Sequence, residues 1–248
     1  LGNQDDQGTK DGIHTAVSVS ILSGSAMILL GFLFGRPMLQ WMGTPADVID
    51  KASLYLMIIF IGMPSNMAYN FGSAILRAMG DTKRPLYFLS AAGVLNVVLN
   101  LIFVILLHMD VAGVALATIL SETLSAVLIL NCLCRTDGPC HLNIRKLYIQ
   151  KDQLFRMLRI GLPAGIQSGM FSFSNVLIQS SINSFGTDTI AAWTAYGKVD
   201  SIFWMIMGAY GVSITTFAGQ NFGAGKYDRI KKSVRICLGL AAVTSLFL

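Results

Sequence analysis

Apolar residues dominate six stretches of the chain, and each stretch is long enough to cross a lipid bilayer as a helix. A membrane-spanning helix needs roughly 20 predominantly apolar residues, whereas a helix on the surface of a soluble protein carries a polar stripe. Segments such as LNLIFVILLHM lack that stripe. The predicted spans are Ile13–Phe34, Leu54–Leu76, Leu86–Leu107, Val111–Leu133, Ile160–Phe185 and Ile190–Phe217, and a further one begins near Val234.

The composition indicates the same class of protein. Of the 248 residues, 54% are hydrophobic and only 12% are charged, whereas about 25% are charged in a typical soluble domain. The mean hydropathy is +0.62. Four cysteines are too few for a disulfide-rich secreted scaffold. These values exclude a disordered chain, disfavour an ordinary soluble enzyme and predict an all-α, polytopic membrane protein.

Basic residues are concentrated on alternate loops. Fifteen of the 18 lysines and arginines lie in 1–12, 77–85, 134–159 and 218–235. The opposite loops hold only Arg36 and Lys51. Because cytoplasmic loops of membrane proteins are enriched in lysine and arginine, the basic loops are predicted to be cytoplasmic. Since the charges are spread over several short loops of one leaflet, they do not form the continuous basic stripe of a nucleic-acid-binding protein.

The longest loop divides the chain into two predicted lobes. Residues 134–159 are polar and include an amphipathic stretch, Leu147–Leu158, which favours a helix on the membrane surface. On this interpretation residues 1–133 form part of one lobe and residues 160–248 form part of another. The loop between them is cytoplasmic.

A short internal repeat supports two related halves. GTKDGI at 8–13 matches GKYDRI at 225–230, and in both places a basic loop enters an apolar run. Homologous halves are common in secondary transporters. The chain begins at Leu1 without an initiator methionine and ends inside an apolar run, so we expect it to be a fragment of a longer protein.

Five motifs, in order along the chain, resemble those of the multidrug and toxic compound extrusion (MATE) family, particularly its Firmicutes-type members. They are LRAMGDTKRPLYF, GVLNVVLNLIFV, GVALATILSE, RIGLPAGIQSG and FAGQNFGAGKYDRIKKSV. The resemblance implies a multi-pass protein of the inner (plasma) membrane, with twelve helices in two six-helix lobes. It implies that drugs are expelled in exchange for Na⁺ or H⁺. On that map the chain covers helices three to eight and the start of nine.

Two pairs of polar residues suggest a cation site. Asn96 and Asn100 are four residues apart, as are Thr118 and Glu122, so each pair shares a helix face. Hard cations prefer several oxygen ligands, including a carboxylate. In some relatives an Asn and an Asp on helix five, with a Thr on helix six, help to form the cation or proton site, and the resemblance places these at Asn96, Asn100 and Thr118. Here Asn100 stands where those relatives have Asp.

Glu122 is our hypothesis for the missing charge at this site. An amide can bind Na⁺ but cannot carry a proton, and Glu122 lies one helical turn from Thr118. The alternative is that Asn96 and Asn100 only hydrogen-bond neighbouring helices.

A second group of residues suggests a place for the transported molecule. Tyr196, Asp200 and Trp204 recur at helical spacing within one apolar run. A carboxylate flanked by aromatic rings suits a lipophilic cation, through charge pairing and cation–π attraction. The alternative is an aromatic anchor at the membrane interface beside a snorkelling Lys198. Polar residues of the preceding run, Gln167 and Asn175, are further substrate candidates.

The sequence predicts a transporter rather than an enzyme. No nucleophile motif, phosphate loop or metalloprotease motif is present. Three cysteines and a histidine near residues 132–141 lack the usual spacing of a metal site, so we expect no metal and no cofactor apart from the coupling ion. We expect a monomer that acts on small-molecule drugs in the bilayer. A flippase for lipid-linked precursors is the alternative, but it needs a cationic cavity, and the intramembrane acids Glu122 and Asp200 outnumber Lys198.

Overall fold

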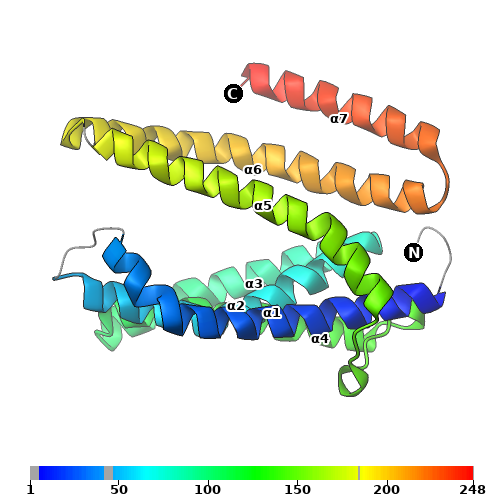
Figure 1. The fold of residues 1–248 in the computed structure, drawn as a ribbon, viewed down its shortest axis with the longest axis horizontal. Coiled ribbons are helices and arrows are strands. Elements are labelled where there is room, and N and C mark those ends of the chain that lie inside the picture. Colours follow the sequence, from blue (N-terminus) through cyan, green and yellow to red (C-terminus); the bar gives the residue numbers. More distant parts are fainter. Residues whose placement is uncertain (1–5, 42–46, 184, 248) are drawn as a thin grey trace. The chain divides into compact units, whose positions relative to one another are not determined.

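The computed structural model describes residues 6–41, 47–183 and 185–247, and these residues form helices and connecting turns with no strand. The helices are α1 (Asp6–Trp41), α2 (Ile49–Ala78), α3 (Lys83–Asn100), α4 (Asp110–Arg135), α5 (Lys151–Asn183), α6 (Thr187–Gly223) and α7 (Tyr227–Phe247) (Figure 1). The all-α fold expected from the sequence is confirmed.

Five helical segments of the described residues are long and apolar enough to cross a membrane: α1, α2, α3 with the turn that follows it, α4 and α6. The predicted span Ile160–Phe185 is helical as far as Asn183, the end of α5. However, α5 is not among the five, because polar residues such as Gln167 and Asn175 interrupt its apolar sequence. The last helix begins earlier than predicted, at Tyr227 rather than near Val234.

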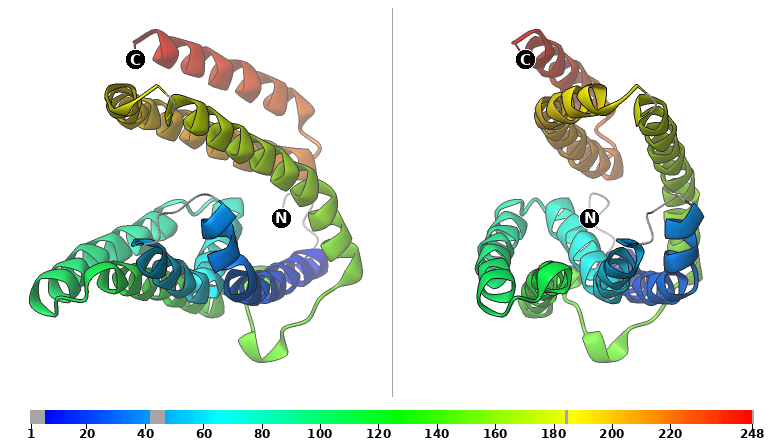
Figure 2. Two further views of the ribbon diagram at one scale, coloured as in Figure 1. Left: turned by 60° about the vertical axis from the view of Figure 1, so that its left-hand side comes forward. Right: turned by 90° about the vertical axis from the view of Figure 1, so that its left-hand side faces the viewer.

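The chain divides into two compact units, one of Asp5–Leu154 and one from Phe155 onward. In the first unit α2 packs against both α1 and α4, and α3 packs against α4 (Figure 2). In the second unit α6 packs against α7. The chain between α4 and α5 and the start of α5, as far as Leu154, belong to the first unit.

Two glycines of α1 allow α2 to approach closely. A Cβ atom at Gly24 would lie 2.5 Å from the Cα of Pro64, and one at Gly31 would lie 2.2 Å from the ring of Phe60. Membrane helices gain most of their association energy from close packing, which small residues permit. The α1–α2 contact therefore depends on these positions having no side chain.

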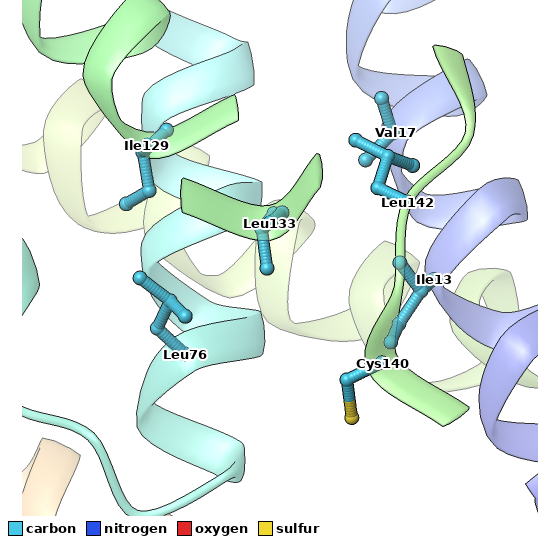
Figure 3. Packing of buried hydrophobic residues seen from close by; sticks show 7 residues of the cluster. All are labelled: Ile13, Val17, Leu76, Ile129, Leu133, Cys140 and Leu142. Carbon is cyan, nitrogen blue, oxygen red and sulfur yellow. The ribbon is translucent and has the colours of Figure 1, made fainter. Parts of the chain in front are cut away.

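The buried apolar cluster lies at the end of the first unit that is predicted to be cytoplasmic (Figure 3). α1, α2 and α4 contribute to it, together with two residues from the chain after α4. Its members are Ile13, Val17, Leu76, Ile129, Leu133, Cys140 and Leu142. The chain between the helices is thus part of the core of this unit.

The turn between α2 and α3 is closed by hydrogen bonds typical of a helix C-terminus. The Asp81 N–H donates to the Leu76 carbonyl at 3.0 Å, and the Gly80 N–H donates to the Arg77 carbonyl at 2.9 Å. Gly80 has φ +89°, a conformation that glycine adopts without strain. This geometry ends α2 and sets the direction of α3.

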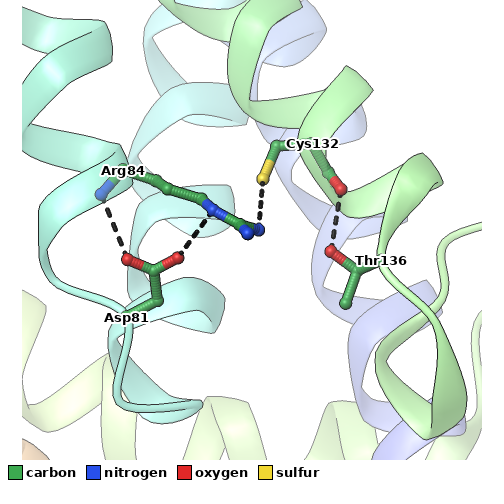
Figure 4. A network of polar contacts seen from close by, with 4 residues as sticks. All are labelled: Asp81, Arg84, Cys132 and Thr136. Carbon is green, nitrogen blue, oxygen red and sulfur yellow. Dashed lines mark hydrogen bonds and ion pairs between the residues drawn. The ribbon is translucent and has the colours of Figure 1, made fainter.

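Arg84 then ties α3 to the end of α4 (Figure 4). Its backbone N–H and its Nε each lie 3.1 Å from a carboxylate oxygen of Asp81, and its Nη1 donates to the Cys132 sulfur at 3.5 Å. The Thr136 hydroxyl donates to the Cys132 carbonyl at 2.8 Å. The GDTKRP motif therefore has a structural role at this end of the bundle.

Three further sequence-based expectations differ from the structure. α1 continues past Phe34 and through Pro37 to Trp41. The predicted helix Leu86–Leu107 is α-helical only to Asn100 and then forms a π-helical turn, Leu101–Leu106. The helix predicted at Leu147–Leu158 begins later than expected: residues 147–150 are not helical, and residues 151–158 form the first turns of α5.

Candidate functional site

Asn96, Asn100 and Ser121 form a polar row between α3 and α4. Asn100 Nδ2 donates to Asn96 Oδ1 at 3.0 Å, and Asn96 Nδ2 donates to the Ser121 hydroxyl at 3.2 Å. The Ser121 hydroxyl donates in turn to the Thr118 carbonyl at 2.8 Å. The shared helix face predicted for the two asparagines is confirmed. The row ends where the π-helical turn begins, a type of irregularity that is frequent at functional sites.

Thr118 and Glu122 do not join this row through their side chains. The Thr118 hydroxyl donates to the carbonyl of Val114 in its own helix, at 2.9 Å. Glu122 instead accepts a hydrogen bond from Asn66 Nδ2 of α2 at 3.1 Å. The four candidate cation ligands therefore lie on two sides of α4, with Glu122 facing α2.

The α2–α4 contact contains polar residues that the sequence reasoning missed. Asn66 Oδ1 accepts a hydrogen bond from Asn70 Nδ2 at 2.9 Å, and the hydroxyls of Ser65 and Thr123 lie 3.0 Å apart. Two adjacent hydrogen-bonded pairs thus join the helices, Asn66 with Glu122 and Ser65 with Thr123. The i,i+4 spacing of Asn66 and Asn70 is the same signal that identified Asn96 and Asn100, and it could have revealed them.

The second unit brings the aromatic and acidic candidates of α6 together. The Tyr196 hydroxyl donates to Asp200 Oδ1 at 3.5 Å, which is the long limit of a hydrogen bond. The Trp193 and Tyr196 rings lie 5.4 Å apart, and the Trp204 ring meets Phe171 of α5 edge-on at 6.2 Å. Aromatic rings therefore lie on both sides of the carboxylate along the helix.

Gln167 and Asn175 stand apart from this group in the structure. Both lie on α5 and are exposed. Among the described residues, no hydrogen bond joins either of them to Tyr196 or Asp200. Their assignment to a substrate site stays a prediction.

Both basic residues of the loops predicted to be external are paired with carboxylates. Arg36 Nη2 lies 2.9 Å from Asp50, and Lys51 Nζ lies 2.6 Å from Asp110. These pairs neutralise the only cations on that side of the predicted topology. They strengthen the charge difference between the two ends of the unit.

The cysteines near residue 132 do not form a metal site within the described part of the chain, which contains no group of three metal-binding side chains. Cys132 lies beside Arg84, whereas Cys140 is buried in the apolar cluster. Burial raises the pKa of the Cys140 thiol, which makes it a poor nucleophile and a poor metal ligand at neutral pH.

The family model named MatE matches residues 1–102 and 163–248. The chain belongs to this family. Members of the family are transporters rather than enzymes, and membership confirms the expected multi-pass, inner-membrane location.

Relatives and solved structures agree with this assignment. The chain is 34% identical over 200 residues to the probable multidrug resistance protein YpnP of Bacillus subtilis, covering 81% of this chain and 44% of YpnP. It is 28% identical over 246 residues to YoeA of the same species, also called a probable multidrug resistance protein, covering 96% of this chain and 53% of YoeA.

The fold matches that of an outward-facing multidrug resistance MATE family transporter of the MOP superfamily. The TM-score is 0.90 at 21% identity, and the match covers 99% of this chain and 55% of that one. The chain thus spans about half the length of the curated relatives that it matches, and its fold is half of the twelve-helix MATE architecture.

Proposed function

We propose that the whole protein exports small organic molecules across the membrane, with lipophilic cations as its main cargo. The observation that carries this proposal is membership of the MatE family, whose relatives YpnP and YoeA are named probable multidrug resistance proteins. The charge preference rests on the apolar runs of this chain, in which the acids Glu122 and Asp200 outnumber Lys198. Ionisable residues at such positions are costly and indicate substrate or ion pathways.

The aromatic group on α6 supports a cationic cargo. Asp200 supplies a negative charge, while Tyr196 and Trp204 supply ring faces one helical turn to either side. A lipophilic cation gains from both the charge and the ring quadrupoles, and it gains more where water is excluded. The Tyr196 hydroxyl lies 3.5 Å from Asp200 Oδ1, so the carboxylate and this ring are close enough to act on one cation.

Export against a concentration gradient needs an energy source, and we assign that role to Na⁺ or H⁺ entering at the first unit. A bare carboxylate within the bilayer is unfavourable, so Glu122 gains from binding a proton or a metal cation. The Asn66 amide orients the carboxylate from the neighbouring helix. Coupling then requires only that the ion and the cargo prefer different conformations of the transporter.

The competing cargo is a lipid-linked precursor, whose phosphates require cationic contacts. The decisive experiment expresses the full-length gene in a drug-sensitive host that lacks its own exporters and follows efflux of a fluorescent lipophilic cation. We expect efflux that stops when one ion gradient is collapsed and continues when the other is collapsed. Absence of efflux for every cation tested, in cells that contain the protein in the membrane, would contradict the proposal and favour the flippase.

A further inference from the structure

The chain that joins α4 to α5 is fixed to α1 by the buried side chain of His14. Only 1% of His14 is exposed. Its Nδ1 lies 2.9 Å from the Lys10 carbonyl, which can only accept a hydrogen bond, so Nδ1 carries the proton. Nε2 is then free to accept the N–H of Asn143 at 3.3 Å. Next to this contact, the Leu142 N–H donates to the Leu133 carbonyl at 3.1 Å.

A second anchor follows a few residues later. The Tyr148 ring stacks on His14 with 5.1 Å between the ring centroids, and the Tyr148 carbonyl accepts the Ser18 hydroxyl at 3.3 Å. The Gln150 N–H donates to the Thr15 hydroxyl at 3.0 Å. These bonds satisfy backbone groups that the absence of helix would otherwise leave unpaired. The segment between the two anchors is thereby held in one conformation.

Residues Ile144–Lys146 form a single 3₁₀ turn between the anchors, which we call the linker turn. The Asn143 side chain caps it by accepting the Arg145 N–H at 3.1 Å. Leu147 packs inward on the apolar cluster, whereas Ile144 is 51% exposed and both cations are exposed. The linker turn therefore presents one apolar side chain beside two positive charges.

No carboxylate of the described residues forms an ion pair with either cation of the linker turn. The described ion pairs involve Arg36, Lys51 and Arg84 instead. The chain between α4 and α5 projects to one side of the bundle formed by α1–α4 (Figures 1 and 2). It does so near the end of the bundle that the basic loops predict to be cytoplasmic.

We propose that the linker turn binds the headgroups of anionic phospholipids in the cytoplasmic leaflet. Lysine and arginine next to a membrane are attracted to anionic lipid, and an exposed Ile144 beside them can enter the interface. The turn is ordered by its anchors before it meets lipid, so little conformational entropy is lost on binding. This interaction goes beyond the proposed export function and does not depend on it. An acidic protein is the alternative partner, and the experiment separates the two.

The experiment places a nitrobenzoxadiazole fluorophore on Ile144→Cys in the full-length protein, with the native cysteines replaced by alanine. The protein is reconstituted in phosphatidylcholine vesicles, or in vesicles with equal amounts of phosphatidylcholine and phosphatidylglycerol. We expect brighter, blue-shifted fluorescence with phosphatidylglycerol. Across a series of phosphatidylglycerol fractions, Arg145→Gln with Lys146→Gln should raise the fraction needed for the half-maximal signal, with roughly 30-fold weaker lipid preference. The charge-retaining variant Arg145→Lys should behave as the parent protein.

The matched control is Lys231→Gln with Lys232→Gln, which removes the same charge from another basic segment, the first turns of α7. We expect it to leave the fluorescence response unchanged. An equal response in both kinds of vesicle, or an equal loss in the control, would overturn the proposal. A response produced by added soluble polyglutamate but not by phosphatidylglycerol would also overturn it, in favour of an acidic protein partner.

Discussion

Glu122 Oε1 accepts a hydrogen bond from Asn66 Nδ2 at 3.1 Å, and this bond joins α4 to α2. The neighbouring residue Ser121 contacts α3 instead, where its hydroxyl accepts a hydrogen bond from Asn96. One helix thus carries two polar contacts with different partners. The carboxylate belongs to the α2 contact, whereas the sequence-based hypothesis grouped it with Asn96 and Asn100 of α3.

The Asn66–Glu122 bond predicts an asymmetry between two substitutions. Asn66→Ala should lower the free energy of unfolding by about 1–3 kcal/mol, because it leaves a partly buried carboxylate without its donor. Glu122→Gln should change it by less than about 1 kcal/mol, since the amide oxygen still accepts from Asn66. Thermal unfolding in detergent measures both. Asn131→Ala, at an exposed position of α4, is the control. Equal effects of all three variants on the free energy of unfolding would contradict this account.

The close approach of α1 and α2 makes Gly24 sensitive to any side chain. Gly24→Ala should destabilise the protein by about 1–3 kcal/mol, because the new methyl group would meet the Pro64 backbone at 2.5 Å. At Gly93 a Cβ atom meets nothing within 4 Å, so Gly93→Ala should be neutral or stabilising by up to about 1 kcal/mol through helix propensity. Thermal melting curves of the two variants measure this difference. A Gly24→Ala variant as stable as Gly93→Ala would contradict the close contact between α1 and α2.

His14 predicts how the chain between α4 and α5 can be released. His14→Ala removes the acceptor for the Asn143 N–H and the ring on which Tyr148 stacks. We expect limited proteolysis to cut residues 141–150 at least several-fold faster in this variant, because local opening of the backbone becomes easier. His141→Ala, at an exposed histidine in the same segment, is the control. Equal cleavage rates in the two variants would mean that His14 does not anchor the segment.

The contact of Tyr148 with Asp11 predicts a pH dependence in the alkaline range. The hydrogen bond that the hydroxyl donates to the carboxylate raises the pKa of Tyr148 above its ordinary value. The neutral phenol is the form favoured by folding, so the contribution is complete below about pH 10 and is lost as pH rises through the raised pKa.

A pH titration followed by the ultraviolet absorbance of tyrosinate tests this prediction. Subtracting the titration of the Tyr148→Phe variant from that of the parent protein isolates the signal of Tyr148. The difference signal should appear at higher pH than for a free tyrosine, and Asp11→Asn should move it to lower pH. A signal at the ordinary tyrosine pKa would show that the contact is absent.

The apolar runs were sufficient to predict which segments are helical, though not where each helix begins and ends, because backbone groups within a bilayer must be paired inside one segment. The spacing of Asn96 and Asn100 also predicted their shared face, since i,i+4 geometry is a property of one helix. Neither prediction depends on how the helices pack against one another.

Sequence spacing could not predict how α4 is rotated about its own axis relative to α2 and α3. This rotation depends on contacts such as Ile119 against Gly62 and Ile129 against Gly72 of α2, which together turn Glu122 toward α2. The start of the helix predicted at Leu147–Leu158 was misplaced for a similar reason. Its amphipathic pattern is real, but Leu147 is partly buried against the apolar cluster, and nearby backbone groups bond to Ser18 and Thr15 of α1.

Ion-driven transport in proteoliposomes tests the central claim most directly. The purified full-length protein, the Glu122→Gln variant and the Asp200→Asn variant would each be given a Na⁺ or an H⁺ gradient, one at a time, and movement of a fluorescent lipophilic cation would be followed. We predict that one of the two gradients drives transport by the parent protein. The Glu122→Gln variant should still bind the dye but should not transport it in response to that gradient. The Asp200→Asn variant should bind the dye more weakly. Full gradient-driven transport by Glu122→Gln would contradict the assignment of Glu122 as the coupling carboxylate.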